Sequence, residues 1–393
     1  MEVLAMPWKE INVMSQKLEF VLRSFKNEMS FTELCTEYGI STKTGYKWKE
    51  RFYQEGIEGL KDKPRTPHNS PTRLSEEVIC ELIRIKNTKK RWGPKKIREV
   101  YANNHPNERI PARSTVERIL KNAGFVATRK RRRHVIPERV QNRIVPAKPN
   151  DLWTVDFKGW WYTKERERCE PLTIRDEFSK YIFSIKIVEK ADITNVKQEF
   201  EHVFKRYGLP EVIRSDNGPP FASALSILGL TRLSAWWLFL GIRLDRIDPG
   251  SPQQNGGHER MHLDIKRELE CKIDGSLKLH QQVFNSWKKE FNTERPHESL
   301  KMKTPEMVYE KSKRKFDGHI HFIEYPGGYT SRQVNDRGYI NHKGRRIFIT
   351  NALGGYNVGL KSKGRSALEV WFNITLLGEI DLNCFMFKSI LAP

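Results

Sequence analysis

Cysteine is scarce in this sequence and follows no pattern. The chain has 393 residues and five cysteines, an odd number, with no C-x-x-C pair. This arrangement argues against a disulfide framework, a structural zinc and a dithiol redox site. We expect a reducing compartment and cysteines that pack as small hydrophobic residues. They are Cys35, Cys80, Cys169, Cys271 and Cys384.

Long apolar runs are also missing. The longest, SAWWLFLGI at residues 234–242, is far shorter than the roughly 20 residues that span a bilayer. The N-terminal segment MEVLAMPWKE lacks the charge and apolar pattern of a signal peptide. The sequence therefore predicts a cytoplasmic protein without a membrane span.

Acidic residues are outnumbered by basic ones. The chain has 48 Asp and Glu against 70 Lys and Arg, a net charge of +22. This excess predicts a polyanionic partner, with nucleic acid first and an anionic membrane surface second. The hydrophobic content of 38% can fill buried cores, and the length allows about two to four domains.

Residues 31–56 have the pattern of a helix-turn-helix. Gly39 tolerates a left-handed turn, Ser41 can cap the second helix, and lysines give that helix positive charge. An ordinary helical hairpin with a solvated basic face is the alternative. We assign residues 1–60 to this domain and the proline-rich residues 61–73 to a linker. Its candidate DNA contacts are Lys43, Lys47 and Lys49.

A second helical domain, helix-turn-helix or winged, is predicted over residues 74–127, with Ser114 capping its third helix. A basic linker over residues 128–149 follows. Such a run is usually a solvated tether, but beside DNA-binding helices it also suits phosphate contact. The three helices are expected at residues 75–87, 94–104 and 112–122. The candidate DNA contacts are Arg113, Arg129, Lys130, Arg131, Arg132 and Arg133.

From residue 151 the sequence becomes rich in β-type segments, and a strongly helical segment follows at residues 191–207. Three strands and then a helix predict an α/β domain, which we assign to residues 150–312. Residues 313–393 contain many glycines and short β-type runs, which predict a small β-barrel or sandwich. The expected strands are residues 152–157, 172–176, 181–188, 212–216 and 242–247 in the first domain, and 346–350 and 368–374 in the second.

Three acidic residues stand where a strand or helix meets a loop. Asp156 lies in the first strand of the α/β domain, Asp216 ends a later strand, and Glu259 begins a helix after a glycine-rich loop. A lone aspartate at a strand end is more often a turn cap. Clustered carboxylates, however, repel one another unless a cation compensates, and Mg²⁺ or Mn²⁺ suits oxygen ligands. Two such ions about 4 Å apart can catalyse phosphoryl transfer.

A competing motif overlaps the third carboxylate. HERMH at residues 258–262 fits H-E-x-x-H, in which two histidines bind zinc. Gly256 and Gly257 place His258 at the fraying start of the helix, which disfavours zinc. A zinc site would also leave the charge and the two aspartates unexplained. In this helix we expect Met261, Ile265 and Leu269 to be buried, and Glu259, His262 and Lys266 to be exposed.

Four segments, WTVDF, SDNGPPFAS, SPQQNGGHER and FNTERPHESL, resemble in this order the motifs of integrase-core insertion-sequence transposases, which are relatives of retroviral integrases. The resemblance covers residues 150–310. It implies a ribonuclease-H-like fold in which Asp156, Asp216 and Glu259 are the catalytic, metal-binding triad for two Mg²⁺ ions, with Mn²⁺ as a substitute. The 259 − 216 − 1 = 42 residues between the last two exceed the usual family spacing. The N-terminal zinc module of the retroviral relatives is missing.

The resemblance also implies DNA strand transfer. Water would free a 3′-hydroxyl at each end of the element, and this hydroxyl would attack target DNA without a covalent enzyme intermediate. The partners would be double-stranded DNA, as terminal inverted repeats and target, and further copies of the chain in a homodimer or larger assembly. The setting would be the bacterial cytoplasm, at the nucleoid. A non-catalytic or domesticated helix-turn-helix regulator that retains the fold is the alternative.

Further residues are expected around the triad. The loop that admits DNA is expected to contain Asn217, Gly218, Gln253, Asn255 and Gly256. The helix after this loop is expected to contact DNA through His262, Lys266 and Arg267.

Overall fold

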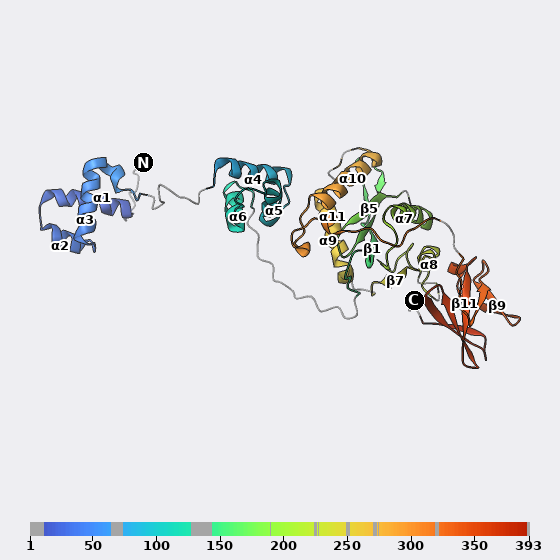
Figure 1. Ribbon diagram of the computed structural model, residues 1–393. Helices are drawn as coiled ribbons and strands as arrows, with labels where there is room; N and C mark the ends of the chain where they lie inside the picture. The colour runs from blue at the N-terminus through green and yellow to red at the C-terminus, as the bar shows by residue number, and fades with distance from the viewer. Residues whose placement is uncertain are drawn as a thin grey trace, which may run out of the picture. The chain divides into compact units, whose positions relative to one another are not determined.

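The computed structural model describes most of the chain. It covers residues 12–63, 74–126, 144–188, 190–223, 226, 228–248, 252–269, 273, 275–318 and 322–390. The chain divides into two compact units, Met1–Leu74 and Ser75–Pro393, and Figure 1 shows their elements. The arginine-rich run 129–133 lies outside the described residues, as does Cys271.

The first unit contains three α-helices and a short 3₁₀ helix in its described part. They are α1 (Val13–Lys26), α2 (Phe31–Glu37), α3 (Thr42–Glu55) and η1 (Gly56–Leu60). Gly39 has φ +63° between α2 and α3, and Ser41 caps α3 by accepting a hydrogen bond from Thr44 N at 3.2 Å. Phe20, Leu34 and Trp48 are buried together between the helices. The predicted helix-turn-helix geometry, with its glycine turn and serine cap, is confirmed.

The second unit begins with a three-helix module. Its helices are α4 (Glu76–Thr88), α5 (Pro94–Asn104) and α6 (Arg113–Asn122), close to the predicted bounds. Leu82, Ile97 and Leu120 belong to its apolar core. The predicted cap is wrong, because α6 begins at Arg113 and Ala112 holds the N-cap position without a side-chain hydrogen bond. Ser114 therefore lies inside the first turn.

A five-stranded mixed sheet forms the centre of the α/β domain. Its order is β5-β4-β1-β6-β7, where β1 pairs antiparallel with β4 and parallel with β6, and β6 pairs parallel with β7. The predicted α/β domain is confirmed. The strands are β1 (Leu152–Phe157), β4 (Pro171–Asp176), β5 (Ile182–Ile187), β6 (Val212–Ser215) and β7 (Arg243–Arg246).

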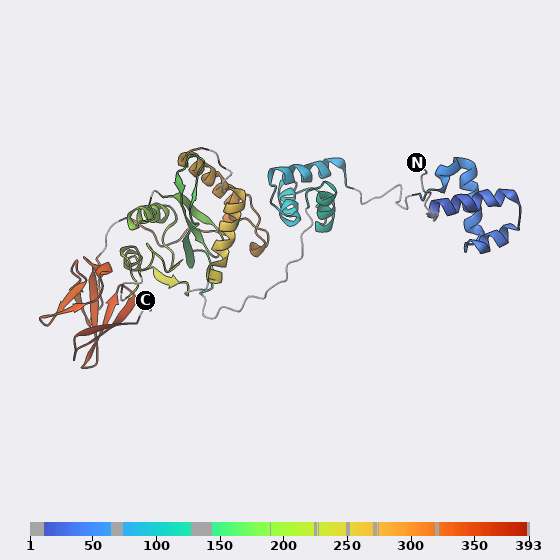
Figure 2. The same cartoon turned by 180° about the vertical axis from the view of Figure 1, so that it is seen from behind.

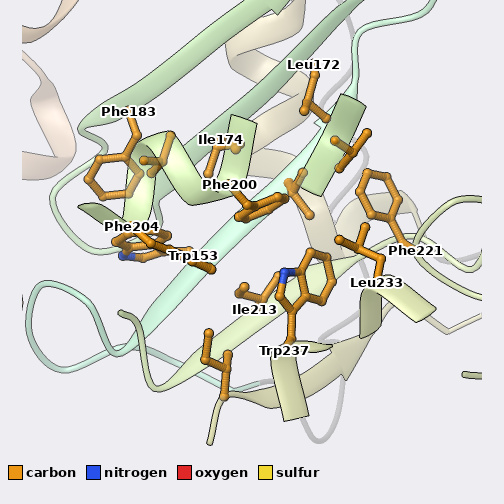
Figure 3. Close-up of a cluster of buried hydrophobic side chains, with 14 of the residues drawn as sticks. Trp153, Leu172, Ile174, Phe183, Phe200, Phe204, Ile213, Phe221, Leu233 and Trp237 are labelled. Atoms are coloured by element: carbon orange, nitrogen blue, oxygen red, sulfur yellow. The ribbon is translucent and has the colours of Figure 1, made fainter. Parts of the chain in front are cut away.

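Helices cover both faces of this sheet (Figures 1 and 2). On one face, α7 (Ile193–Tyr207) and α8 (Arg232–Phe239) bury Trp153 of β1 together with Phe200 and Trp237 (Figure 3). On the other face lie α9 (Gly256–Glu268) and α10 (Leu277–Thr293), which bury Ile265 and Phe284. Short segments complete the domain: η2 (Pro252–Asn255), η3 (Glu298–Leu300), α11 (Pro305–Val308), and a hairpin of β2 (Trp161–Tyr162) and β3 (Arg168–Cys169).

Alternation along the strands separates apolar from polar side chains. Trp153 and Val155 of β1 belong to the core with α7 and α8, so Thr154 and Asp156 face the opposite side, towards α9. The register pairs Asp156 with Thr173 of β4, which brings Thr173 to the same side. The face under α9 thus carries a row of polar side chains within a well-packed domain.

The C-terminal part consists of β-strands and one short 3₁₀ helix in its described residues, and it belongs to the predicted β class. A five-stranded antiparallel sheet has the order β14-β13-β12-β11-β8, and a separate hairpin pairs β9 with β10. Val358, Phe372 and Ile380 lie in its apolar core. The elements are β8 (Tyr329–Gln333), β9 (Tyr339–His342), β10 (Arg345–Phe348), η4 (Asn351–Leu353), β11 (Asn357–Lys363), β12 (Ala367–Phe372), β13 (Thr375–Asp381) and β14 (Met386–Ser389).

The structure tests two predictions, the absence of a membrane-spanning helix and the burial of the cysteines. Within the described part of the chain, no helix is both long enough and apolar enough to cross a membrane. Cys35 and Cys169 are buried, as expected for small hydrophobic residues. Cys80 and Cys384 are exposed, so the same expectation is wrong for them.

Candidate active site

Asp156 is electrostatically coupled to the other two predicted carboxylates. It lies near the carboxyl end of β1, and its side chain remains 25% exposed. The pKa of Asp156 is raised to about 7. Burial is the largest cause, and the charges of Asp216 and Glu259 also contribute. The charges of two residues that follow Asp156 by 60 positions and then a further 43 positions along the chain thus act on its carboxyl group. Such an arrangement is electrostatically costly without a cation.

Asp216 follows directly after β6. Burial raises the pKa of its carboxyl group, while a hydrogen bond from the backbone N–H of Gly218 opposes this rise. Asn217 donates from Nδ2 to Ile247 O at 2.5 Å, which ties the turn to the residue after β7. Oδ1 of Asp216 is buried and has no hydrogen-bond partner within the described residues. A buried oxygen of this kind is suited to accept an external donor or cation.

The segment that precedes Glu259 is helical, which corrects the prediction of a glycine-rich loop. Residues 252–255 form η2, and Gly256 and Gly257 are the first two residues of α9. Gln254 is buried and exchanges two hydrogen bonds with Asp248, at 2.8 and 2.5 Å. Glu259 lies in the first turn of α9 and is exposed. Of the predicted loop residues, Asn217 and Gly218 lie in the turn after β6, Gln253 and Asn255 in η2, and Gly256 in α9.

The two histidines of H-E-x-x-H face the sheet. His258 is fully buried, with Nδ1 2.8 Å from Thr154 Oγ1 and Nε2 2.5 Å from Thr173 Oγ1. Burial lowers the pKa of His258 well below its usual value. Because both ring nitrogens already have hydrogen-bond partners, His258 is unsuited to bind zinc, and the zinc interpretation fails on geometry.

His262 is not on an exposed face, so that prediction is wrong. Its side chain is 12% exposed, and Nε2 lies 2.7 Å from Thr173 Oγ1. Burial, together with the charges of Lys158 and Arg175, lowers the pKa of His262 to about 3. The other α9 predictions are confirmed, since Met261, Ile265 and Leu269 are buried and Lys266 is exposed.

The Thr173 hydroxyl fixes the orientation of both imidazoles. It donates its one hydrogen to the backbone oxygen of Asp156 at 2.9 Å. Its oxygen also lies within hydrogen-bond distance of Nε2 of both His258 and His262. The other ring nitrogen of His262, Nδ1, lies 3.9 Å from Asp156 Oδ2. Through this one hydroxyl, β4 connects the strand that carries Asp156 with the helix that carries Glu259.

A buried ion pair holds the start of α9. Arg175 is almost fully buried, pairs with Glu177, and donates from Nη1 to Gly257 O at 2.7 Å. Burial alone would raise the pKa of Glu177, but Arg175 and Lys180 lower it to about 2. These residues, like Thr154 and Thr173, were missed in the sequence. The sequence contains little indication of their role, because threonines and charged residues that alternate with apolar ones are ordinary in strands.

The predicted DNA contacts lie on several elements. Lys43 and Lys47 of α3 are exposed, whereas Lys49 is half-buried and donates to Ser24 O at 3.3 Å. Arg113 is exposed at the start of α6. Lys266 and Arg267 are exposed in the last turn of α9.

Two family models, each described as "Integrase core domain", match residues 146–252 and 240–305. Residues 146–305 of this chain therefore match an integrase core domain. Models described as "Helix-turn-helix domain" and "Homeodomain-like domain" match residues 16–68 and 44–120. These matches confirm both the resemblance found in the sequence motifs and the predicted fold class, with helix-turn-helix modules before an integrase core.

Proteins of insertion elements and retroviruses are similar to this chain. The insertion element IS407 uncharacterized 31.7 kDa protein of Burkholderia multivorans is 24% identical over 257 residues, which are 65% of this chain and 88% of that protein. The IS476 uncharacterized 39.2 kDa protein of Xanthomonas euvesicatoria is 27% identical over 58% of this chain and 63% of that protein. The Gag-Pol polyprotein of baboon endogenous virus is 33% identical over 31% of this chain but 7% of the polyprotein.

Solved integrase structures also match. The HTLV-2 integrase catalytic core domain in complex with magnesium (trimeric form) is 19% identical and aligns with 42% of this chain and 99% of that chain, with a TM-score of 0.32. The simian T-cell lymphotropic virus intasome in complex with PP2A regulatory subunit B56 gamma is 15% identical. It aligns with 79% of this chain and 99% of that chain, with a TM-score of 0.37.

Proposed function

We propose that this protein is a transposase that cleaves and joins DNA strands at the ends of an insertion sequence, with Asp156, Asp216 and Glu259 as the catalytic residues. The observation that carries the proposal is the raised pKa of Asp156, which burial and the charges of Asp216 and Glu259 cause together within an integrase core. Perturbed carboxylates at strand ends are typical of catalytic sites in α/β domains.

The carboxylates fit a divalent cation. Oxygen-only ligands favour Mg²⁺ or Mn²⁺, and the buried Oδ1 of Asp216, which has no partner in the described residues, suits a cation. No three His, Cys, Asp or Glu side chains of the described chain converge as a complete metal site. Mg²⁺ is usually held by one or two carboxylates together with substrate phosphates. Two bound ions would activate the attacking oxygen and stabilise the leaving oxygen.

The chain's own residues would orient the reaction. Asp156 would be held by β1 and by the Thr173 hydrogen bond to its carbonyl, and Glu259 by the buried start of α9. In cleavage, a water oxygen bonds to phosphorus and the bond to the 3′-oxygen breaks, which leaves a 3′-hydroxyl. In transfer, that hydroxyl oxygen bonds to a target phosphorus and displaces the target 3′-oxygen.

Double-stranded DNA is the proposed partner. The net charge of +22 and the exposed Lys43 and Lys47 of α3 support phosphate contact by the helix-turn-helix. Lys266 and Arg267, which follow Glu259 along α9, would lie along DNA near the site. A homodimer or larger assembly is proposed because two ends of one element must be brought together.

The full chain is tested with DNA that carries the element's terminal inverted repeats, a target plasmid, and Mg²⁺ or Mn²⁺. Glu259→Gln is expected to reduce cleaved and joined products at least about 100-fold, because a ligand change should exceed the effect of altering its supporting residues. Glu201→Gln is the matched control, since Glu201 of α7 is partly exposed and pairs with Lys197 at 3.8 Å. If Glu259→Gln were as active as the wild type, the catalytic assignment would be lost. A wild type that binds DNA without forming products would favour the regulator.

A further inference from the structure

Two aromatic side chains are exposed at the β2–β3 hairpin: Tyr162 of β2 and Trp160, the residue directly before this strand. Trp160 is 54% exposed and Tyr162 is 59% exposed, whereas Trp161 between them is 7% exposed and packs against Phe284 with ring centroids 6.2 Å apart. This is the alternation of a strand with one buried face. The outward rings of Trp160 and Tyr162 lie edge to face at 5.3 Å. Two exposed large aromatics side by side are unusual on a surface that binds nothing.

The hairpin is anchored rather than loose. Thr163 N donates to Glu167 O at 2.9 Å across its tip, and Glu167 Oε2 accepts from Leu277 N at 3.1 Å, at the start of α10. The buried Trp161 fixes the same hairpin to the core. The exposed rings are therefore held on a fixed element, so little ordering is needed when a ligand stacks on them.

Two basic side chains lie beside this hairpin. The Arg168 guanidinium lies 5.2 Å from the Trp160 ring centroid, pairs with Glu170 at 2.8 Å, and belongs to the strand partner of Tyr162. Lys158 Nζ lies 4.8 Å from the Trp161 ring centroid. Aromatic rings with adjacent cations are the arrangement that proteins use for single-stranded nucleic acid, with stacked bases and neutralised phosphates.

The rings are also close to the carboxylates along the chain. Trp160 is four residues beyond Asp156, which limits the separation of their Cα atoms to about 14 Å. At a strand rise of roughly 3.4 Å per nucleotide, this span is at most about four nucleotide steps. Lys158 lies between Asp156 and Trp160 in the sequence, and its charge contributes to the lowered pKa of His262, which lies beside Asp156. One DNA strand can therefore reach both places.

We propose that Trp160 and Tyr162 form a stacking platform for an unpaired nucleobase, within about four nucleotides of the phosphate bound at Asp156. The platform rests on the proposed function for its place in the reaction, but base stacking does not require catalysis. It would hold the frayed end of a strand away from its complement, because a base on the platform cannot remain stacked in the duplex. Any base can occupy it, since every base has a π-face.

The test compares two DNA ligands of the full chain in buffer with EDTA, where no cleavage occurs. One is a blunt duplex and the other is the same duplex with a four-nucleotide single-stranded tail that contains 2-aminopurine. The wild type is expected to bind the tailed DNA about 10-fold more tightly and to quench the fluorescence of the base analogue. Trp160→Ala and Tyr162→Ala are expected to lose this preference, and Trp160→Phe to retain most of it. Phe322→Ala is the control, because Phe322 is 86% exposed in the C-terminal part.

The outcomes separate the platform from the proposed function. A wild type that prefers the tail but forms no strand-transfer product would retain the platform and lose the transposase assignment. Equal binding of tailed and blunt DNA by the wild type would overturn the platform whatever the catalytic result. So would alanine variants that keep the tail preference, or that change the oligomeric state in light scattering, which would indicate a protein interface.

Discussion

Asp156→Asn is expected to abolish strand transfer and, above pH 7, to raise the free energy of unfolding of the metal-free protein. The pKa of Asp156 rises from an ordinary 3.8 to about 7 in the folded protein. Between these two pH values the folded state therefore binds more protons than the unfolded state, and stability falls as the pH rises through this window. Above pH 7 the full electrostatic cost is present, and below pH 3.8 it is absent.

The expected gain in the free energy of unfolding follows from the rise in the pKa of Asp156. At 1.36 kcal/mol per pKa unit, an upper bound is on the order of 4 kcal/mol, and solvent around the 25% exposed side chain reduces it to on the order of 1–3 kcal/mol. Asparagine removes the charge and keeps the shape, so the gain is expected at pH 8 and should be much smaller at pH 5. A catalytic side chain would thus be kept at a cost to the fold.

Calorimetric unfolding of the wild type and Asp156→Asn at pH 5 and pH 8, with EDTA or Mg²⁺, measures this effect. Mg²⁺ is expected to stabilise the wild type at pH 8, because a ligand that binds only the folded state raises its stability, and to stabilise Asp156→Asn much less. Glu201→Gln is expected to behave as the wild type does. A loss of stability in Asp156→Asn at pH 8, or an unchanged response to Mg²⁺, would contradict the assignment.

Gly257→Ala is expected to have a large effect, whereas Gly256→Ala should have almost none. A Cβ on Gly257 would lie 2.3 Å from Arg175 Nη2 and 2.9 Å from Glu177 Oε1, while a Cβ on Gly256 would meet nothing within 4 Å. Crowding a packed interior typically costs about 1–3 kcal/mol, and complete loss of a buried ion pair costs about 3–5 kcal/mol. Alanine at position 256 should be neutral or stabilise by up to about 1 kcal/mol, because it lies within helix α9.

The same pair of variants tests the positioning of Glu259. Gly257 is two residues before Glu259, and its carbonyl accepts the hydrogen bond from Arg175. We expect Gly257→Ala to lower strand transfer at least about 10-fold, since small misplacements of catalytic groups are costly. Calorimetry and the transfer assay on both variants measure the difference. Equal stability and activity of the two would show that the buried pair does not hold α9.

The α/β fold was accessible from the sequence because strands and helices there have strong local signals. The run from Leu152 to Phe157 is β-rich, and the helix α7 ends at a glycine, so their order alone predicts an α/β domain. The coupling of Asp156 and Asp216 followed from the same argument, since carboxyl ends of strands meet at one edge. Local sequence patterns were sufficient to predict the strands and helices whose formation depends on neighbouring residues in the chain.

The start of α9 was mispredicted because a long-range contact decides it. Two successive glycines favour a break in a helix, yet here the missing Cβ of Gly257 makes room for Arg175 and Glu177. His262 was assigned to the exposed face because the helical pattern contains no information about Thr173, its partner on β4. Only the pairing of Asp156 with Thr173 in the sheet reveals the row of polar side chains under α9. The prediction that Ser114 caps α6 was wrong for a simpler reason, because this helix begins one residue before Ser114.

The proposed transposase joins a DNA 3′-hydroxyl to target DNA through Asp156, Asp216 and Glu259. The most direct measurement is the joining of a labelled DNA end to a plasmid in Mg²⁺, with the end terminating in either a 3′-hydroxyl or a 3′-deoxy sugar. We predict joined product only for the hydroxyl end, only with Glu259 intact, and with no DNA attached to the denatured protein. Joining of the 3′-deoxy end, protein-linked DNA, or full activity of Glu259→Gln would rule out this mechanism.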